Sequence, residues 1–409
     1  MLPLRGVRVL DLSRVLAGPT CSQMLGDLGA EVIKIERPGR GDDTRHWGPP
    51  FVNGESAYFL QCNRNKKSVA IDLSTREGVK LVRQLATKSD VVLENFRADF
   101  FERQKQRLGS DALCPDALIS EKPSLIWCSI SGYGREGPMA NTAGYDAMVQ
   151  AGFGMSSITG EKDGAPVKVG VAVTDLFTAN HATIGILAAL LQRQHTGIGQ
   201  RLECSLMASQ LASLANVASD FLLAGKEGQR LGSAHASIVP YEYFACKDEQ
   251  YLALGAANDA QFAALCEILG IPLEERFDSN AKRVANRTVL LPQLRTILLQ
   301  KTAQEWEHIL DEYTKEHRIG PVYQSVRTVS QALSHPQVEA CNIVREMEHS
   351  TCGTIKYVAP PFKAHNGDTF TSVRQAPPVL GEHTNEVLSE LLQLDGAALQ
   401  QLQSEGIVQ

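Results

Sequence analysis

The chain reads Val167-Lys-Val-Gly-Val-Ala-Val-Thr-Asp-Leu-Phe-Thr-Ala-Asn180, a β-branched run that stops at a threonine and an aspartate and turns directly into an apolar helix. The apolar positions between Ala179 and Arg193 fit a buried helix, which places Asp175 at or near its first turn. A carboxylate there accepts backbone N–H bonds and lies at the positive end of the helix dipole, so we expect Asp175 to be held ionised even among apolar side chains. Such a carboxylate is a poorly hydrated nucleophile. By position alone, Asp175 also suits an N-cap, because aspartate is a common capping residue.

Alternating strand and helix patterns lead up to this stretch. Val7–Asp11 and Val32–Ile35 predict strands on either side of a helix at Cys21–Leu28, a β-α-β unit. Further strands are expected at 68–72, 91–94 and 125–131, and helices at 77–87 and 143–149. Such units build parallel sheets that bind ligands at the carboxyl ends of their strands. The fingerprint G-x-G-x-x-G does not occur at the first turn, so we expect an α/β, Rossmann-like sheet without a nicotinamide cofactor.

The second half of the chain changes character. Ser205–Leu223 predicts one apolar helix, and Gly225–Gly232 predicts a linker. A strand is expected at 251–257, followed by helices near 260–269, 290–299 and 303–313.

Composition narrows the class of protein. The 409 residues are 43% hydrophobic and 21% charged, as in an ordinary soluble protein with room for two or three domains. A formal net charge of −6 disfavours a role on nucleic acid or a membrane surface, so local arginines must meet any anionic ligand. The nine cysteines form no C-x-x-C pair, which indicates reduced thiols and no metal or redox centre. The longest apolar run, Ile184–Leu191, is too short to span a membrane.

The heptapeptide Gly-Val-Ala-Val-Thr-Asp-Leu (170–176) resembles the nucleophile motif of the class III CoA-transferase family, the formyl-CoA and carnitine CoA-transferase type. In that family the aspartate forms acyl anhydrides and a CoA thioester. Further segments resemble the family in the same order along the chain: LDLSRVLAGP (10–19), LGAEVIKIERP (28–38), NRNKKS (63–68), ENFR (94–97), SISGYG (129–134) and APPVLGEHT (376–384). The resemblance therefore covers essentially the whole chain.

The resemblance implies a particular architecture. It predicts a large domain that begins with residues 1–224, a small domain with linkers at 225–325, and a C-terminal segment, 326–409, that returns to the large domain. It also implies an interlocked homodimer, in which segments 226–240 and 320–334 would thread the partner chain.

CoA is a large anion, which needs cationic side chains near its phosphates and apolar surface for its adenine and pantetheine parts. Arg37 follows the second predicted strand at the end where a parallel sheet binds ligands. Arg103 is the family's later arginine, with Arg107 as its rival, because the segment between Asn95 and Pro123 is longer than the family pattern. The resemblance assigns CoA contacts to Val15, Ala17, Arg37, Leu73, Asn95, Phe96, Arg103, Tyr145 and Asp146. Outside the motif, any of these arginines reads as a solvated surface charge.

Tyr145 separates transfer from racemisation. The related α-methylacyl-CoA racemases carry a histidine at this position, and a tyrosine is poorly matched to removing a proton beside a thioester. Tyr145 therefore favours transfer, although a packing role suits it equally well. The resemblance also places Gly232 and His235 near the substrate, while a lone loop histidine is more often structural. The residues Gly381–Thr384 are typical of the start of a helix, and we expect no metal site there.

Within the family, the branch that uses succinate with glutarate or hydroxymethylglutarate is the most similar. Its shared runs include GDDTRHWGPPF (41–51) and GSAHASIVPY (232–241). We therefore expect CoA to pass from a dicarboxylyl-CoA such as succinyl-CoA to a free dicarboxylate, through aspartyl anhydride and aspartyl-CoA intermediates on Asp175. The alternatives are a racemase, a class III transferase with another acceptor, and a non-catalytic CoA-binding protein. No tightly bound cofactor is expected. With the first strand starting near Val7, the location is the cytoplasm, or the mitochondrial matrix if a presequence has been removed.

Overall fold

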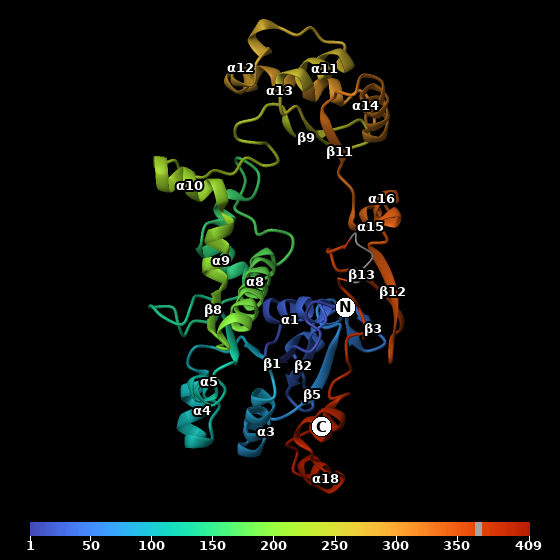
Figure 1. Ribbon diagram of the computed structural model, residues 1–409. Helices are drawn as coiled ribbons and strands as arrows, with labels where there is room; N and C mark the ends of the chain where they lie inside the picture. The colour runs from blue at the N-terminus through green and yellow to red at the C-terminus, as the bar shows by residue number, and fades with distance from the viewer. Residues whose placement is uncertain (365–369) are drawn as a thin grey trace. The chain divides into compact units, whose positions relative to one another are not determined.

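The computed structural model describes residues 1–364 and 370–409 (Figure 1). The chain forms two compact units. The first contains Met1–Met155, Lys168–Lys226 and Cys341–Gln409, and the second contains Ser156–Val167 and Glu227–Ala340. The sequence-based ranges divide the chain differently, because they ended the small domain at residue 325 and left Ser156–Val167 in the large one.

A parallel sheet forms the centre of the first unit, with strands in the order β5-β2-β1-β6-β7-β8. Counted along the chain within this sheet, the order is 3-2-1-4-5-6, and it reverses between β1 and β6. Ligands of such sheets bind outside the carboxyl ends of the strands at this reversal. The predicted α/β fold with a parallel sheet is confirmed. The strands are β1 (Arg8–Asp11), β2 (Glu31–Glu36), β5 (Lys66–Ala70), β6 (Val91–Glu94), β7 (Ile126–Ser131) and β8 (Arg201–Ser205).

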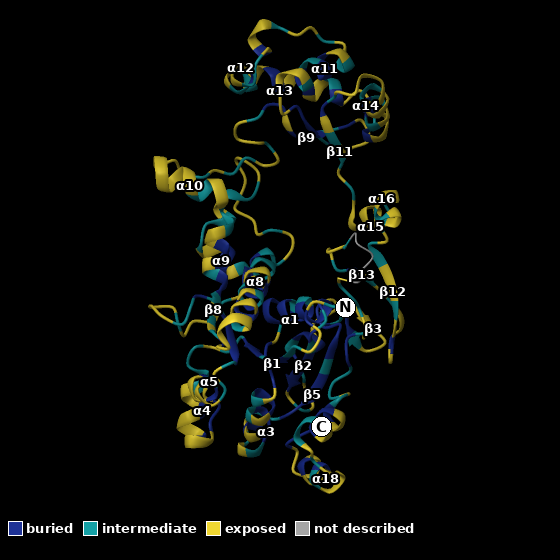
Figure 2. Cartoon of the chain, viewed as in Figure 1, coloured by how far each residue is buried: buried dark blue, intermediate teal, exposed yellow. Residues whose placement is uncertain are grey.

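Helices cover both faces of this sheet, and its inner strands β2, β1, β6 and β7 are largely buried (Figure 2). On one face, α1 (Ala17–Asp27) and α8 (Val173–Thr196) pack against a core that includes Val9, Val91 and Ile126. The opposite face packs its own core against α3 (Arg76–Thr87), α5 (Pro115–Glu121), α17 (Thr384–Leu392) and α18 (Gly396–Ser404). Strands covered on both sides need apolar side chains at successive positions, which is why β1, β6 and β7 read as short apolar runs, while β2 and β5 bury Lys34 and Lys66 in ion pairs.

The β-branched run at 167–171 forms no strand, and α8 begins shortly after it at Val173. Two other features of the first unit differ from the sequence-based expectations. The expected helix at 205–223 divides into α9 (Leu206–Ser213) and α10 (Ala215–Ala224), which bend by 78° where Ala215 adopts a φ of +50°. The edge strand β8 was not predicted. The remaining elements of this unit are β3 (Phe51–Val52), β4 (Glu55–Ser56), α2 (Ala57–Leu60), α4 (Phe100–Leu108), α6 (Asp146–Gly152), β12 (Val344–His349), β13 (Gly353–Val358) and the 3-10 turns Asp43–His46 and Gly109–Asp111.

The second unit has an antiparallel sheet in the order β11-β10-β9. Its core includes Phe244, Leu252, Phe262 and Trp306. The strands are β9 (Tyr241–Ala245), β10 (Tyr251–Gly255) and β11 (Val322–Ser325). The helices are α11 (Asp259–Leu269), α12 (Asn280–Ala285), α13 (Arg287–Leu298), α14 (Ala303–His317), α15 (Val329–Leu333) and α16 (Pro336–Ala340), with a 3-10 turn at Glu275–Phe277. The division of the chain between the two units falls within α7 (Met155–Ile158).

By length and composition, α8 is long and apolar enough to cross a membrane, and the bent pair α9 and α10 passes the same test together. The core helix of a folded domain passes this test too, and α8 packs on the sheet through Ala179, Ala182 and Ile186. The sequence predicted this helix between Ala179 and Arg193, and the structure extends it to Val173–Thr196.

Candidate active site

The start of α8 is capped from another helix. Ala172, at the N-cap position, offers no side-chain hydrogen bond, and Asp175 lies in the first turn. The Asp146 carboxylate, at the start of α6, accepts the backbone N–H groups of Thr174 at 2.8 Å and Asp175 at 3.2 Å. Gln150 donates to the other oxygen of Asp146 at 2.6 Å. The alternative role of Asp175 as the N-cap is therefore wrong, because Asp146 performs that function.

The Asp175 carboxylate is half-buried and receives no hydrogen bond or ion pair from the residues that the structure describes. Burial, and in second place the negative charge of the nearby Asp146 carboxylate, together raise its pKa to about 7. This corrects the expectation that the helix start holds Asp175 fully ionised. The backbone N–H groups that would favour its charged form are directed at Asp146 instead.

Asp175 faces a cleft of about 500 Å³ within the first unit. The cleft lies at the carboxyl ends of β1, β6 and β7, where the strand order reverses. Its walls bring together the predicted nucleophile and five of the predicted CoA contacts: Asp175, Val15, Ala17, Asn95, Phe96 and Tyr145. Asp146 does not line it, because this buried carboxylate is engaged by the backbone of α8. Asp146 caps α8, and its contact with CoA stays a prediction.

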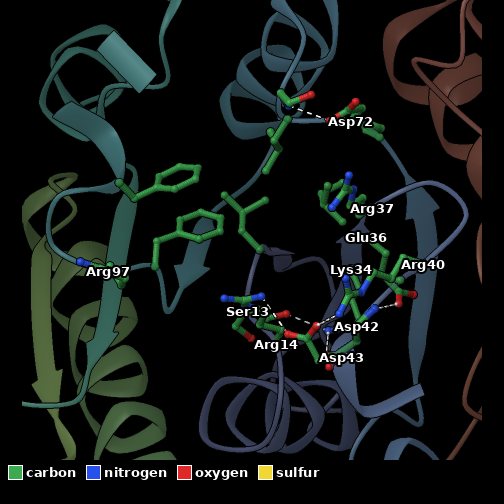
Figure 3. Close-up of a pocket in the computed structure, with 18 of the residues that line it drawn as sticks. Ser13, Arg14, Lys34, Glu36, Arg37, Arg40, Asp42, Asp43, Asp72 and Arg97 are labelled. Carbon is green, nitrogen blue, oxygen red and sulfur yellow. Dashed lines mark hydrogen bonds and ion pairs between the residues drawn. The ribbon is translucent and has the colours of Figure 1, made fainter. Parts of the chain in front are cut away.

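A second cleft of about 570 Å³ adjoins the first (Figure 3). The two share Arg14, Arg40, Asp43, Phe96 and Arg97 as lining residues. The remaining predicted CoA contacts, Arg37, Leu73 and Arg103, line the second cleft together with Arg107. The predicted residues thus divide into one group around Asp175 and another around the arginines.

The arginines of the second cleft differ in how they are paired. Arg37 is exposed and has no side-chain partner among the described residues. Arg103 pairs with Asp99 at 2.6 Å, and Arg107 reaches only the Leu73 carbonyl oxygen at 3.5 Å. Both Arg103 and Arg107 line the cleft, so the choice between them stays open. Arg37 is the cation most free to meet a phosphate.

The loops that form the clefts are tied to each other. The backbone N–H of Arg14 donates to the Asn95 side chain at 3.0 Å, and the Asn95 amide donates to the Arg14 carbonyl at 2.7 Å. Val15 has a φ of +73°, a conformation that is costly for a β-branched residue and common at functional sites. The first βα loop is therefore fixed in an unusual shape at the mouth of the cleft.

The sequence model of CoA-transferase family III matches residues 4–384. The chain belongs to this family. It is 43% identical over 412 residues to the succinyl-CoA:glutarate CoA-transferase of Mus musculus, covering all of this chain and 91% of that protein. It is also 40% identical over 407 residues to the succinate–glutarate CoA-transferase of Agrobacterium fabrum, covering 97% of each.

Solved structures agree with this assignment. The crystal structure of a CaiB/BaiF family protein from Brucella suis matches this CoA-transferase with a TM-score of 0.82 and 38% identity. The match covers 95% of this chain and 99% of that one.

Two predicted substrate residues of this CoA-transferase belong to the second unit. Gly232 has a φ of +58°, and its N–H donates to the Gly160 carbonyl at 3.0 Å. His235 donates its backbone N–H to Tyr241 at 2.9 Å, and its Nδ1 accepts from Ser237 at 3.1 Å. These bonds shape the loop in which both residues lie, and their contact with substrate stays a prediction.

Sequence reasoning did not assign three arginines of the clefts, namely Arg14, Arg40 and Arg97, or the buried Lys34. Arg14 and Arg97 stand in motifs that carry the family resemblance, so their position next to Val15 and Phe96 was the available signal. Within residues 1–364 and 370–409, no group of three or more His, Cys, Asp or Glu side chains is arranged to hold a metal ion.

Proposed function

We propose that this CoA-transferase moves CoA from succinyl-CoA to glutarate, with hydroxymethylglutarate as a second acceptor. The names of relatives that align over nearly the whole chain support the substrate pair. The observation that carries the chemistry is the position of Asp175, a carboxylate without a partner in its surroundings that faces a cleft continuous with a group of arginines.

In this proposal CoA occupies both clefts. Its phosphates lie among Arg37 and the neighbouring arginines, and its adenine contacts Leu73 and Phe96. The pantetheine arm then passes the first βα loop, at Val15 and Ala17, toward Asp175. This arrangement places the CoA phosphates beside the arginines and the thioester beside the Asp175 carboxylate.

Asp175 acts by covalent catalysis. Its carboxylate attacks the thioester carbonyl of succinyl-CoA, which expels CoA thiolate and leaves an aspartyl–succinyl anhydride. The thiolate attacks the aspartyl carbonyl of this anhydride, which releases succinate and forms an aspartyl-CoA thioester. Glutarate then attacks that thioester, and the expelled thiolate attacks the glutaryl carbonyl of the new anhydride. Glutaryl-CoA leaves, and the Asp175 carboxylate is restored.

Each intermediate keeps the acyl group activated, so water must be kept from it. Tyr145 lines the Asp175 cleft at the position where a racemase carries its histidine base, which supports transfer over proton removal. Gly232 and His235 are proposed to contact the acceptor carboxylate. No tightly bound cofactor is needed, because CoA enters and leaves as a substrate.

Exposed apolar side chains support a homodimer. Leu222 and Leu223 at the end of α10 are 80% and 87% exposed, and Ile184 and Leu191 on α8 are 63% and 59% exposed (Figure 2). Apolar surface of this extent commonly marks an interface. We propose that a second copy covers it in an interlocked dimer. The proposed compartment is the mitochondrial matrix, or the cytoplasm if no presequence exists.

A substrate panel tests the proposed function. Purified enzyme is incubated with each of several acyl-CoA donors and free carboxylates, and the new CoA thioesters are measured by mass spectrometry. Succinyl-CoA with glutarate should give the highest kcat/KM. A preference for a monocarboxylate acceptor, or hydrolysis without transfer, would contradict the proposal.

A further inference from the structure

We propose that Asp42 is a positioning residue that joins the two loops which receive CoA. The inference rests on the proposed placement of CoA in the two clefts, and it concerns a residue that makes no contact with the reacting atoms. Asp42 lies in the loop after β2, next to the loop after β1, and lines the second cleft (Figure 3).

Asp42 binds the first of these loops, residues 12–16, at Val15. The backbone N–H of Val15 donates to the two oxygens of Asp42 at 3.1 and 3.2 Å. Val15 is the residue with a φ of +73°, and such a conformation persists only where its surroundings impose it. The Asp42 carboxylate is the acceptor that fixes this peptide group.

Lys34 also binds this loop, through the Ser13 carbonyl. Its ammonium group donates to Asp42 at 2.9 Å and to the Ser13 carbonyl at 2.8 Å. The side chains of Lys34 and Asp42 are 1% and 0% exposed, so this is a fully buried ion pair. Burial alone would raise the pKa of Asp42, but Lys34 and the backbone N–H of Thr44 outweigh it and lower that pKa to about 2.

The second loop carries the free arginine. Arg37 begins a turn that closes when the N–H of Gly41 donates to the Arg37 carbonyl at 2.8 Å. Asp42 follows immediately, and its backbone N–H donates to Glu36 at 2.9 Å. Gly41 has a φ of +70°, and a Cβ there would lie 2.9 Å from the Glu36 carboxylate, so the turn packs tightly against the end of β2.

Asp42 therefore connects the loop after β1 with the loop after β2 through its own side chain and backbone. Its side chain sets the position of Val15, while its backbone ends the turn that starts at Arg37. Every neighbour of its carboxylate is a donor: Lys34 Nζ, Val15 N, Thr44 N and Thr44 Oγ1. An asparagine keeps only one acceptor oxygen, so its NH2 group would face either Lys34 or the backbone N–H groups of Val15 and Thr44, and the shared bond to Val15 would be weakened.

A matched pair of variants tests this role in the full-length enzyme. Asp42→Asn should raise the KM for succinyl-CoA at least tenfold and leave kcat within about threefold, because Asp42 makes no contact with α8 or Asp175. Asp27→Asn is the control. Asp27 forms another buried ion pair in the same unit, with Arg64 at 2.6 Å, but at the last residue of α1 and away from both clefts. It should lower the melting temperature and leave the KM within twofold.

A third variant separates position from stability. Lys34→Met with Asp42→Leu removes both buried charges together, so its melting temperature should exceed that of Asp42→Asn. Its KM should stay at least tenfold raised, because Val15 N–H still lacks its acceptor. Amide hydrogen exchange should be faster at Val15 in both Asp42 variants and unchanged in Asp27→Asn. A KM that returns to normal with the melting temperature would show a purely structural role and overturn the inference.

Arg37→Ala distinguishes this inference from the placement of CoA on which it rests. If Arg37→Ala raises the KM and folded Asp42→Asn does not, the positioning role is wrong and the CoA site stands. If neither change affects the KM, the placement of CoA in these clefts is itself wrong.

Discussion

The Asp146 carboxylate accepts the backbone N–H of Asp175 at 3.2 Å, so one carboxylate caps the helix that carries another. This geometry gives the proposed nucleophile a fixed backbone and also an adjacent negative charge. The charge and the burial of Asp175 act in the same direction and raise its pKa to about 7. A nucleophilic carboxylate with that pKa is only partly ionised at neutral pH.

Asp146→Asn should therefore shift the pH dependence of transfer. If Asp175 is the nucleophile, it must be ionised, so kcat/KM should rise with pH through about 7 in the unmodified enzyme. Removal of the Asp146 charge lowers the pKa of Asp175, and the rising limb should move to lower pH by roughly half a unit to one unit. Steady-state kinetics from pH 5 to 9 measure the limb.

Gln150→Met is the matched control for this shift. It removes the side chain that donates to Asp146 at 2.6 Å but keeps the Asp146 charge. The limb should stay in place for Gln150→Met even if the activity falls. Equal shifts in both variants would mean that local packing, and no charge effect, sets the pKa of Asp175.

Asp175→Asn should stabilise the protein at alkaline pH. The pKa of Asp175 is raised in the folded chain, so the native state binds more protons than the unfolded state between about pH 4 and pH 7, and stability falls as pH rises through that window. The destabilisation by the charged Asp175 is complete above about pH 7, where Asp175→Asn should raise the free energy of unfolding by roughly 1–3 kcal/mol. The gain should vanish near pH 4. Urea unfolding of both proteins at pH 4.5 and pH 8.5 measures it; an equal difference at the two pH values would contradict the raised pKa.

Arg37→Ala should mainly weaken the binding of CoA. Loss of one charge-assisted contact with phosphate costs roughly 1.5–3 kcal/mol, which corresponds to a KM raised about ten- to a hundredfold. Arg103→Ala and Arg107→Ala then decide between the two open candidates, because only the one that contacts CoA should raise the KM comparably. Dephospho-CoA thioesters serve as the control, since an arginine bound to the 3′-phosphate should show no effect with them.

The sequence predicted the sheet well because each of its inner strands is covered on both faces. Val91–Glu94, for example, is fully buried, and its apolar run therefore marks the strand and both of its ends. The edge strand β8 escaped prediction because Arg201 and Glu203 alternate with Leu202 and Cys204, a pattern too short to distinguish from a loop.

The candidate site was predictable only where a residue's role depends on its own neighbours in sequence. Val15, Arg37 and Asn95 follow strands and so fall at the carboxyl edge of the sheet by topology alone. The role of Asp146 depends on Thr174, a residue 28 positions later, and no periodicity encodes that contact. The expected charge state of Asp175 was wrong for the same reason, since the cap that takes its N–H group comes from a different helix.

The covalent route through Asp175 predicts that oxygen passes from acceptor to donor. When glutarate labelled with oxygen-18 in its carboxylates attacks the aspartyl-CoA thioester, one labelled oxygen becomes the bridge of the new anhydride. Thiolate attack on the glutaryl carbonyl leaves that oxygen on Asp175. In the next turnover the Asp175 carboxylate attacks succinyl-CoA, and the released succinate carries the label in part.

Mass spectrometry of succinate over repeated turnovers should therefore show oxygen-18, and succinyl-CoA alone should give a CoA adduct at residue 175 that hydroxylamine converts to a hydroxamate. Asp175→Ala should bind CoA normally but lose transfer by roughly a thousandfold or more, with neither label nor adduct. CoA exchange that proceeds in the unmodified enzyme without label transfer and without an adduct would require direct attack of glutarate on succinyl-CoA, and the nucleophilic role of Asp175 would then be wrong.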